Sequence, residues 1–190
     1  MQKIVPPNPL IVAIGGVSRS GKTFLAEALQ LRIGNSVVVH QDEFIPAEDK
    51  LPVINGHINW EIPEAIDWSG FMNAISKAIS SGKSVIAEGL MVFQNPELNK
   101  LFHKAIFINL SRETFAERKQ TDLRWGKEPD WYINHIWDSY LIYGQVPASV
   151  KDVLLLDGET DFDTGHILNF LMKPSTHRLR ISGKHGYNLF

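Results

Sequence analysis

Gly16-Val17-Ser18-Arg19-Ser20-Gly21-Lys22-Thr23 is the stretch of this sequence that decides the fold. It fits the pattern of a glycine, four variable residues and Gly-Lys-Ser/Thr, which is typical of loops that bind nucleotide phosphates. The glycines let backbone N–H groups approach the phosphate oxygens, the lysine supplies a cation, and the threonine hydroxyl can bind Mg²⁺. We expect a nucleotide to contact Gly16, Ser18, Ser20, Gly21, Lys22, Thr23 and the adjoining Phe24.

The residues on either side of this phosphate loop (residues 16–23) have the pattern that the motif requires. Residues 10–14 are an apolar run typical of a buried strand, and residues 24–31 carry apolar side chains at helical spacing. The helix would point the positive end of its dipole at the bound anion. The order of strand, loop and helix therefore favours a nucleotide site over a glycine-rich turn in some other α/β protein.

Strands and helices continue to alternate along the chain. We expect strands over residues 36–40, 84–88, 105–110 and 153–156, and helices over residues 67–82, 111–121, 129–143 and 162–172. Asp67 and Ser111 are expected to cap two of these helices. Residues 43–63 contain prolines and Asn55-Gly56, and they are expected to form a loop. The pattern, without hairpin signals, predicts an α/β fold with a parallel sheet and helices on both of its faces.

Composition bounds the domain organisation and the class of partner. The 190 residues are enough for one domain spanning 1–190, and the last residues, about 174–190, are expected to be loosely ordered. A net charge of -2 gives no reason to expect nucleic acid or a membrane as a partner, and the lack of cysteine excludes disulfide and thiolate chemistry. We therefore expect a cytoplasmic protein, with access to the nucleus, that acts on small molecules.

Two acidic positions lie where parallel strands end, which is where such sheets bind ligands. Asp42 follows the strand 36–40, and either Asp42 or Glu43 could orient an acceptor hydroxyl and take its proton, unless both only cap a turn. Glu88 ends the strand 84–88 and could hold Mg²⁺ through a water, or bond to the phosphate loop. These residues and Lys22 predict phosphoryl transfer.

The segment after the fourth strand supplies candidate cations. Arg118 and Arg124 are the preferred residues of a lid over about 118–131, where they would meet the charge of a transferring phosphoryl group. Trp60 and Trp125 lie in expected loops, where an aromatic ring could stack on a planar base. His40 and His135 have no metal-ligand partners at a recognisable spacing and are interpreted as structural.

Four blocks, taken together, resemble the nicotinamide riboside kinases, which group with uridine kinases: residues 16–23, 41–44, 59–67 and 86–93. The resemblance runs from about residue 11 to residue 158. It implies a P-loop kinase fold of three layers, with a five-stranded parallel sheet and a small lid. The implied activity is ATP-dependent phosphorylation of the 5′-hydroxyl of nicotinamide riboside, giving the mononucleotide.

The resemblance also implies roles for individual residues. Asp42 would be the base and Glu88 the carboxylate beside magnesium, while Glu61 would bind the ribose hydroxyls. Trp60 and Trp125 would enclose the nicotinamide ring. Glu61 is one methylene longer than the aspartate usual in the family. The chain has no evident counterpart of the hairpin that uridine kinases place around the pyrimidine.

Other functions remain open at this point. A uridine, cytidine or other small-metabolite kinase on the same scaffold is the first alternative, and a nucleotide-binding protein without catalysis is the second. The sequence lacks the Asn-Lys-x-Asp motif by which GTPase switches read guanine, and both Lys22 and Asp42 are present. We expect ATP and Mg²⁺ as cofactors and a monomer or weak homodimer.

Overall fold

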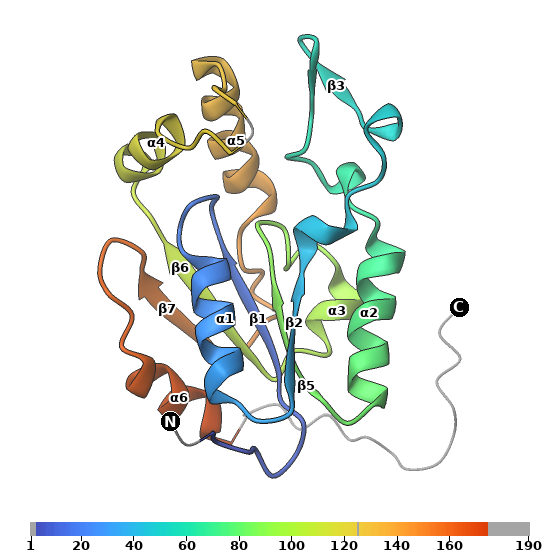
Figure 1. Ribbon diagram of the computed structural model, residues 1–190, viewed down its shortest axis with the longest axis vertical. Helices are drawn as coiled ribbons and strands as arrows, with labels where there is room; N and C mark the ends of the chain where they lie inside the picture. Colours follow the sequence, from blue (N-terminus) through green and yellow to red (C-terminus); the bar gives the residue numbers. More distant parts are fainter. Residues whose placement is uncertain (1–2, 125, 175–190) are drawn as a thin grey trace.

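A five-stranded parallel sheet forms the centre of the molecule (Figure 1). The computed structural model describes residues 3–124 and 126–174. The strands are β1 (Ile11–Gly16), β2 (Ser36–His40), β5 (Ser84–Glu88), β6 (Lys104–Asn109) and β7 (Val153–Asp157). Their order across the sheet is β2-β5-β1-β6-β7, so the strand before the phosphate loop lies in the middle. The predicted five-stranded parallel sheet is confirmed.

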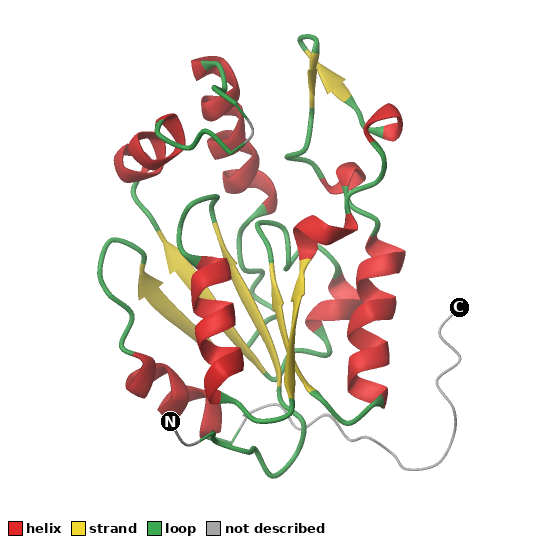
Figure 2. Ribbon diagram, in the orientation of Figure 1, coloured by secondary structure: helices red, strands yellow, loops and turns green. Residues whose placement is uncertain are grey.

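Helices cover both faces of this sheet, and the molecule has three layers (Figure 2). The α-helices are α1 (Lys22–Arg32), α2 (Trp68–Ser80), α3 (Pro96–Asn99), α4 (Arg112–Gln120), α5 (Asp130–Tyr143) and α6 (Thr164–Met172). Helices α1 and α6 bury Leu25, Leu29 and Ile167 in one core. Helices α2 to α5 bury another core on the opposite face, with Phe71 and Tyr132 among its side chains.

Side-chain caps set where several helices begin. The Asp67 carboxylate accepts a hydrogen bond from Gly70 N at 2.9 Å, and the Ser111 hydroxyl accepts one from Thr114 N at 3.2 Å. Both predicted caps are therefore confirmed. Asp163 caps α6 in the same way, accepting from His166 N at 3.0 Å, and this helix consequently starts two residues later than expected.

The segment between β2 and α2 is more structured than the sequence indicated. It contains an antiparallel hairpin of β3 (Val53–Ile54) and β4 (His57–Ile58), and the short 3₁₀ helices η1 (Gln41–Phe44), η2 (Glu48–Lys50) and η3 (Pro63–Ala65). Asn55 and Gly56 have φ angles of 49° and 77°, and such positive values suit a tight two-residue hairpin turn. The expectation of a chain without hairpins is wrong here, because two-residue strands are too short to show alternation.

The carboxyl ends of the sheet strands point toward α4, α5 and the β3–β4 hairpin, which stand apart above the sheet in Figure 1. The predicted lid, residues 118–131, takes in the end of α4, the connection and the start of α5. The predicted loose tail lies outside the described residues from residue 175 onward. No helix within residues 3–124 and 126–174 is long and apolar enough to cross a membrane.

Replacing Phe71 with alanine tests the core under α2. Phe71 is fully buried and packs its ring against Phe44 and Trp68. We expect Phe71→Ala to lower the free energy of unfolding by about 3–5 kcal/mol, since it removes buried apolar surface and leaves a cavity. Chemical denaturation measures this, with Leu31→Ala as the control because Leu31 is 70% exposed. Equal losses in the two variants would contradict the assignment of this core.

Candidate active site

The phosphate loop connects β1 to α1 and is shaped to hold an anion. Gly16 has a φ of 148°, and a Cβ at this position would lie 2.6 Å from Ile108 O and 2.8 Å from Ser20 Oγ. Gly21, at the start of α1, has a φ of 101° and no side chain that caps the helix. The first backbone N–H groups of α1 therefore remain free for a phosphate.

Two polar groups of the loop agree with this use. The Ser20 hydroxyl is buried and has no hydrogen-bond partner within the described part of the chain. The Lys22 ammonium group donates to Val17 O at 2.9 Å, so the lysine side chain folds back across the loop. A buried hydroxyl without a partner and a nearby cation fit a nucleotide phosphate, as predicted from the motif.

Glu88 links the loop to the neighbouring strands. Strands β2 and β5 pair in register so that His40 lies beside Glu88 at their carboxyl ends. The buried Glu88 Oε1 accepts from Thr23 Oγ1 at 3.1 Å and lies 2.7 Å from His40 Nδ1. The predicted structural bond between Glu88 and the phosphate loop is confirmed. His40, interpreted from sequence as structural, contacts the candidate metal ligand.

The oxygen atoms of Thr23 and Glu88 are the ligand type that Mg²⁺ prefers. In residues 3–124 and 126–174 no group of three or more His, Cys, Asp or Glu side chains could hold a metal. This composition fits Mg²⁺, which is commonly bound by one or two protein ligands together with waters and substrate phosphates. Since Glu88 Oε1 already has two partners, Oε2 is the oxygen left for a metal or its water.

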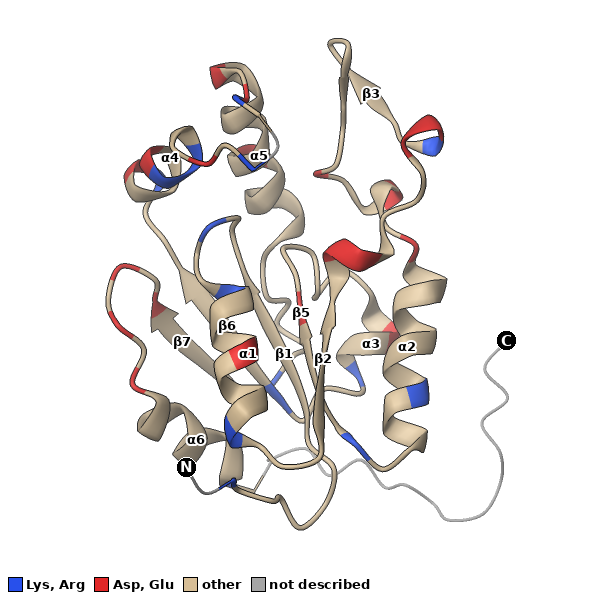
Figure 3. Ribbon diagram, viewed as in Figure 1, with Lys and Arg blue, Asp and Glu red and all other residues tan. Residues whose placement is uncertain are grey.

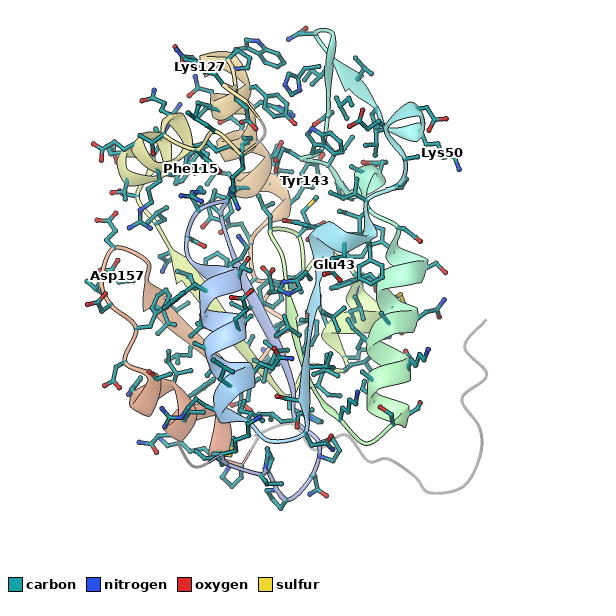
Figure 4. The ribbon with its side chains drawn as sticks, in the orientation of Figure 1. Glu43, Lys50, Phe115, Lys127, Tyr143 and Asp157 are labelled. Atoms are coloured by element: carbon teal, nitrogen blue, oxygen red, sulfur yellow. The ribbon has the colours of Figure 1, made fainter. Side chains whose placement is uncertain are left out.

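Asp42, in η1, is electrostatically coupled to two other predicted site residues. Its charge contributes to raising the pKa of Glu61 and that of Arg124. Glu43, the alternative base, lines an open recess of about 510 Å³ together with Lys50 and Asp67, and the phosphate loop does not line this recess (Glu43 and Lys50 are labelled in Figure 4). Of the two carboxylates, Asp42 is the one that contributes to these pKa shifts.

The candidate lid contacts the phosphate loop through arginines. Arg118 Nη1 donates to Arg19 O at 3.2 Å, and Arg118 lines a recess of about 250 Å³ with Ser20, Gly21 and Phe24. Residues 158–162, which follow β7, close the other side of this recess. Four predicted nucleotide-site residues are thus brought together.

Arg124 is engaged differently. Its guanidinium makes two bonds to the buried Asp122 carboxylate, at 2.8 and 2.7 Å, and these bonds hold the pKa of Asp122 well below its usual range. Arg19 of the phosphate loop approaches the same carboxylate at 3.8 Å. Asp122 therefore joins a lid arginine to the loop, although no motif in the sequence points to this residue. Figure 3 shows acidic and basic positions close together on the neighbouring α4.

The acceptor side of the site lies beyond β4. Trp60 packs against the core, and Glu61 is partly buried, with its backbone N–H bonded to Asn59 Oδ1 at 3.3 Å. Burial, and next the charge of Asp42, raise the pKa of Glu61 to about 7, although Lys119 lowers it. The charge of Asp42 thus acts on Glu61. The predicted second aromatic, Trp125, lies outside the described residues.

A buried ion pair also faces Glu61. Lys119 Nζ lies 3.0 Å from Glu128 Oε1, their side chains are 8% and 13% exposed, and both charges act on Glu61. In the sequence, neither residue stands out from the other charged residues of this segment. A spacing of nine residues across an irregular connection gives no pattern from which this pair could be recognised.

Glu61→Gln tests the burial of this carboxyl group. With a pKa raised from 4.5 to about 7, the neutral carboxyl favours folding at low pH, and that contribution is lost as the pH rises through 7. Removing the charge should therefore stabilise the nucleotide-free protein at pH 8 relative to pH 4.5, by up to about 3 kcal/mol. Denaturation at the two pH values measures this, with Glu64→Gln, at an exposed position, as the control. An effect of the same size at both pH values would contradict the raised pKa.

Comparison with known proteins agrees with this arrangement. The chain is 30% identical to nicotinamide riboside kinase 1 of Rattus norvegicus over 166 residues, which cover 78% of this chain and 85% of the relative. It is 28% identical to nicotinamide riboside kinase 2 of Homo sapiens over 170 residues, covering 78% and 74%. No family model matches the chain.

Solved structures agree on the fold. A sugar kinase from Janibacter sp. HTCC2649 superposes with a TM-score of 0.52 at 16% identity, covering 82% of this chain and 88% of that one. A protein of Chloroflexus aurantiacus provisionally assigned as a kinase gives 0.56 at 17% identity, covering 86% and 96%. Taken with the sequence relatives, which span most of both chains, these findings show that the protein belongs to the nicotinamide riboside kinase family.

Proposed function

We propose that the protein transfers the γ-phosphoryl group of ATP to the 5′-hydroxyl of nicotinamide riboside, giving nicotinamide mononucleotide and ADP. The observation that carries this proposal is the bond between Thr23 of the phosphate loop and Glu88 at the end of β5, in a chain of this family. The charge of Asp42 also acts on Glu61, which would put the proposed base near the proposed ribose-binding carboxylate. The same edge of the sheet carries the phosphate loop.

The roles of the residues follow from this arrangement. Asp42 would accept the proton of the 5′-hydroxyl as its oxygen bonds to the γ-phosphorus, and the bond to the β–γ bridging oxygen would break, leaving ADP. Lys22 and Arg118 would stabilise the negative charge on the phosphates. Thr23 and Glu88 would hold Mg²⁺, which, when bound, neutralises charge on the β- and γ-phosphates.

The acceptor would be bound by the residues after β4. The Glu61 carboxylate would accept hydrogen bonds from the ribose hydroxyls, and Trp60 would stack on the pyridine ring with Trp125 on its other side. Gly16, Ser18, Gly21 and Phe24 would contact the nucleotide, and Arg124 would reach it from the lid. We further propose one cytoplasmic domain, monomeric or weakly homodimeric, whose partners are small molecules rather than nucleic acid or a membrane.

A kinase for uridine or cytidine is the second candidate. The β3–β4 hairpin favours this candidate. Uridine kinases place a hairpin around the pyrimidine, and the sequence had indicated no counterpart of it in this chain. The relatives named for nicotinamide riboside favour the first proposal.

An acceptor panel decides between the two candidates. ADP release with ATP and Mg²⁺ is measured for nicotinamide riboside, nicotinic acid riboside, uridine, cytidine and no acceptor, with Lys22→Ala as the inactive reference. We expect strong release with the pyridine ribosides alone. ADP release with uridine or cytidine would mean that a pyrimidine nucleoside is the acceptor in place of nicotinamide riboside. No ADP release with any acceptor would overturn the kinase proposal.

Asp42→Asn tests the base. We expect kcat to fall about a hundred-fold or more, because a positioned base is lost, while ATP affinity changes less than about three-fold. Glu43→Gln is the matched control, since Glu43 lines the separate recess. Steady-state kinetics and a nucleotide-binding titration measure both quantities. If the two variants are equally active, Asp42 is not the base.

A further inference from the structure

Helix α5 bonds directly to the chain segment on the acceptor side of the site. Tyr132, in the first turn of α5, is fully buried. Its hydroxyl donates to Ile58 O at 3.0 Å and accepts from Trp60 N at 3.2 Å. One side-chain hydroxyl therefore holds two backbone groups on either side of Asn59.

One turn later, His135 bonds to the residue between these two groups. His135 Nε2 lies 2.8 Å from Asn59 Oδ1, which also accepts from Glu61 N at 3.3 Å. Because the amide oxygen can only accept, Nε2 carries the proton in this contact. Asn59 is 8% exposed. Its amide oxygen links the His135 ring of α5 to the backbone N–H of Glu61.

These bonds fix four consecutive residues, 58–61, which we call the acceptor segment. They use backbone groups and the Asn59 amide, so the side chains of Trp60 and Glu61 stay available for a ligand. His57, just before the segment, stacks on the Tyr132 ring with centroids 4.0 Å apart. Side chains of helix α5 thus hold the acceptor segment, which contains the two predicted acceptor contacts, Trp60 and Glu61.

The same helix is attached to the lid. Glu128, two residues before α5, pairs with Lys119 of α4 in the buried ion pair described above. The residues just before α5 thus contact α4, and the first turns of α5 contact the acceptor segment.

We propose that Tyr132 and His135 are positioning residues for the acceptor, which hold residues 58–61 so that Trp60 and Glu61 meet the riboside. The proposal rests on the proposed function for the identity of the acceptor only. It assigns neither residue a contact with the riboside or with the reacting atoms.

The first test separates acceptor binding from nucleotide binding. Tyr132→Phe keeps the buried ring and removes the two bonds, and Tyr140→Phe removes another largely buried hydroxyl from the same helix. We expect Tyr132→Phe to raise the KM for the acceptor about ten-fold and the KM for ATP less than about two-fold, and Tyr140→Phe to change neither. Equal changes in both KM values, or equal effects of the two variants, would overturn the proposal.

His135 allows a rescue test with the same assay. His135→Leu should raise the KM for the acceptor by a similar factor, whereas His135→Gln, which retains an N–H donor, should stay within about three-fold of the wild type. In a Trp60→Ala background the effect of Tyr132→Phe should shrink, because there is no ring left to position. A glutamine variant as impaired as the leucine variant would contradict a role for the bond to Asn59.

A readout without substrate keeps this inference separate from the proposed function. Hydrogen exchange of the Trp60 and Glu61 amides should become at least about ten-fold faster in Tyr132→Phe and unchanged in Tyr140→Phe. Unchanged exchange in Tyr132→Phe would overturn the positioning role, even in an active kinase. Faster exchange in a protein that phosphorylates no acceptor of the panel would leave the positioning of the segment standing and refute the proposed function.

Discussion

The structure depends on one steric constraint, which is the close approach of the backbone at the turn from β1 into the phosphate loop. At Gly16 a Cβ would lie 2.6 Å from the carbonyl oxygen of Ile108, so β1 and β6 can approach here only without a side chain. Strand β1 lies in the middle of the sheet, between β5 and β6. The phosphate loop follows β1 at the carboxyl edge of the sheet. Side chains from the rest of the chain can therefore reach the loop from the carboxyl ends of strands near β1, or from segments that extend over this edge of the sheet.

The parallel register provides the first kind of group. Ile14 pairs with Glu88 and Glu88 with His40, so three strands end at nearly the same level. A carboxylate that follows a buried strand is thereby brought to the first turn of α1, where Thr23 bonds to it. No loop has to adapt for this contact, which explains why Glu88 and the phosphate loop could be linked from the sequence alone.

The sequence predicted what depends on local pattern and missed what depends on long-range contacts. Strands β2 and β5 have the predicted bounds, because each is a short run of apolar residues that follows a turn signal in the sequence. The β3–β4 hairpin was missed because its strands have two residues each. The bond between Tyr132 and Ile58 joins residues 74 positions apart. Asp122 contacts arginines from two segments, Arg124 of the lid and Arg19 of the phosphate loop. Neither set of contacts has a sequence spacing that a periodic pattern could reveal.

The acceptor side follows a different principle, because charges rather than backbone geometry dominate it. Burial and the like charges of Asp42 and Glu128 raise the pKa of Glu61, and the opposing charges of Lys119 and Lys22 lower it. An enzyme that packed this region for stability alone would avoid such a cluster. The cost is understandable if ribose hydroxyls donate to the Glu61 carboxylate and thereby stabilise its charged form in the complex. On this view the bound acceptor completes the hydrogen bonding of the site, and the cluster is destabilising only while the acceptor is absent.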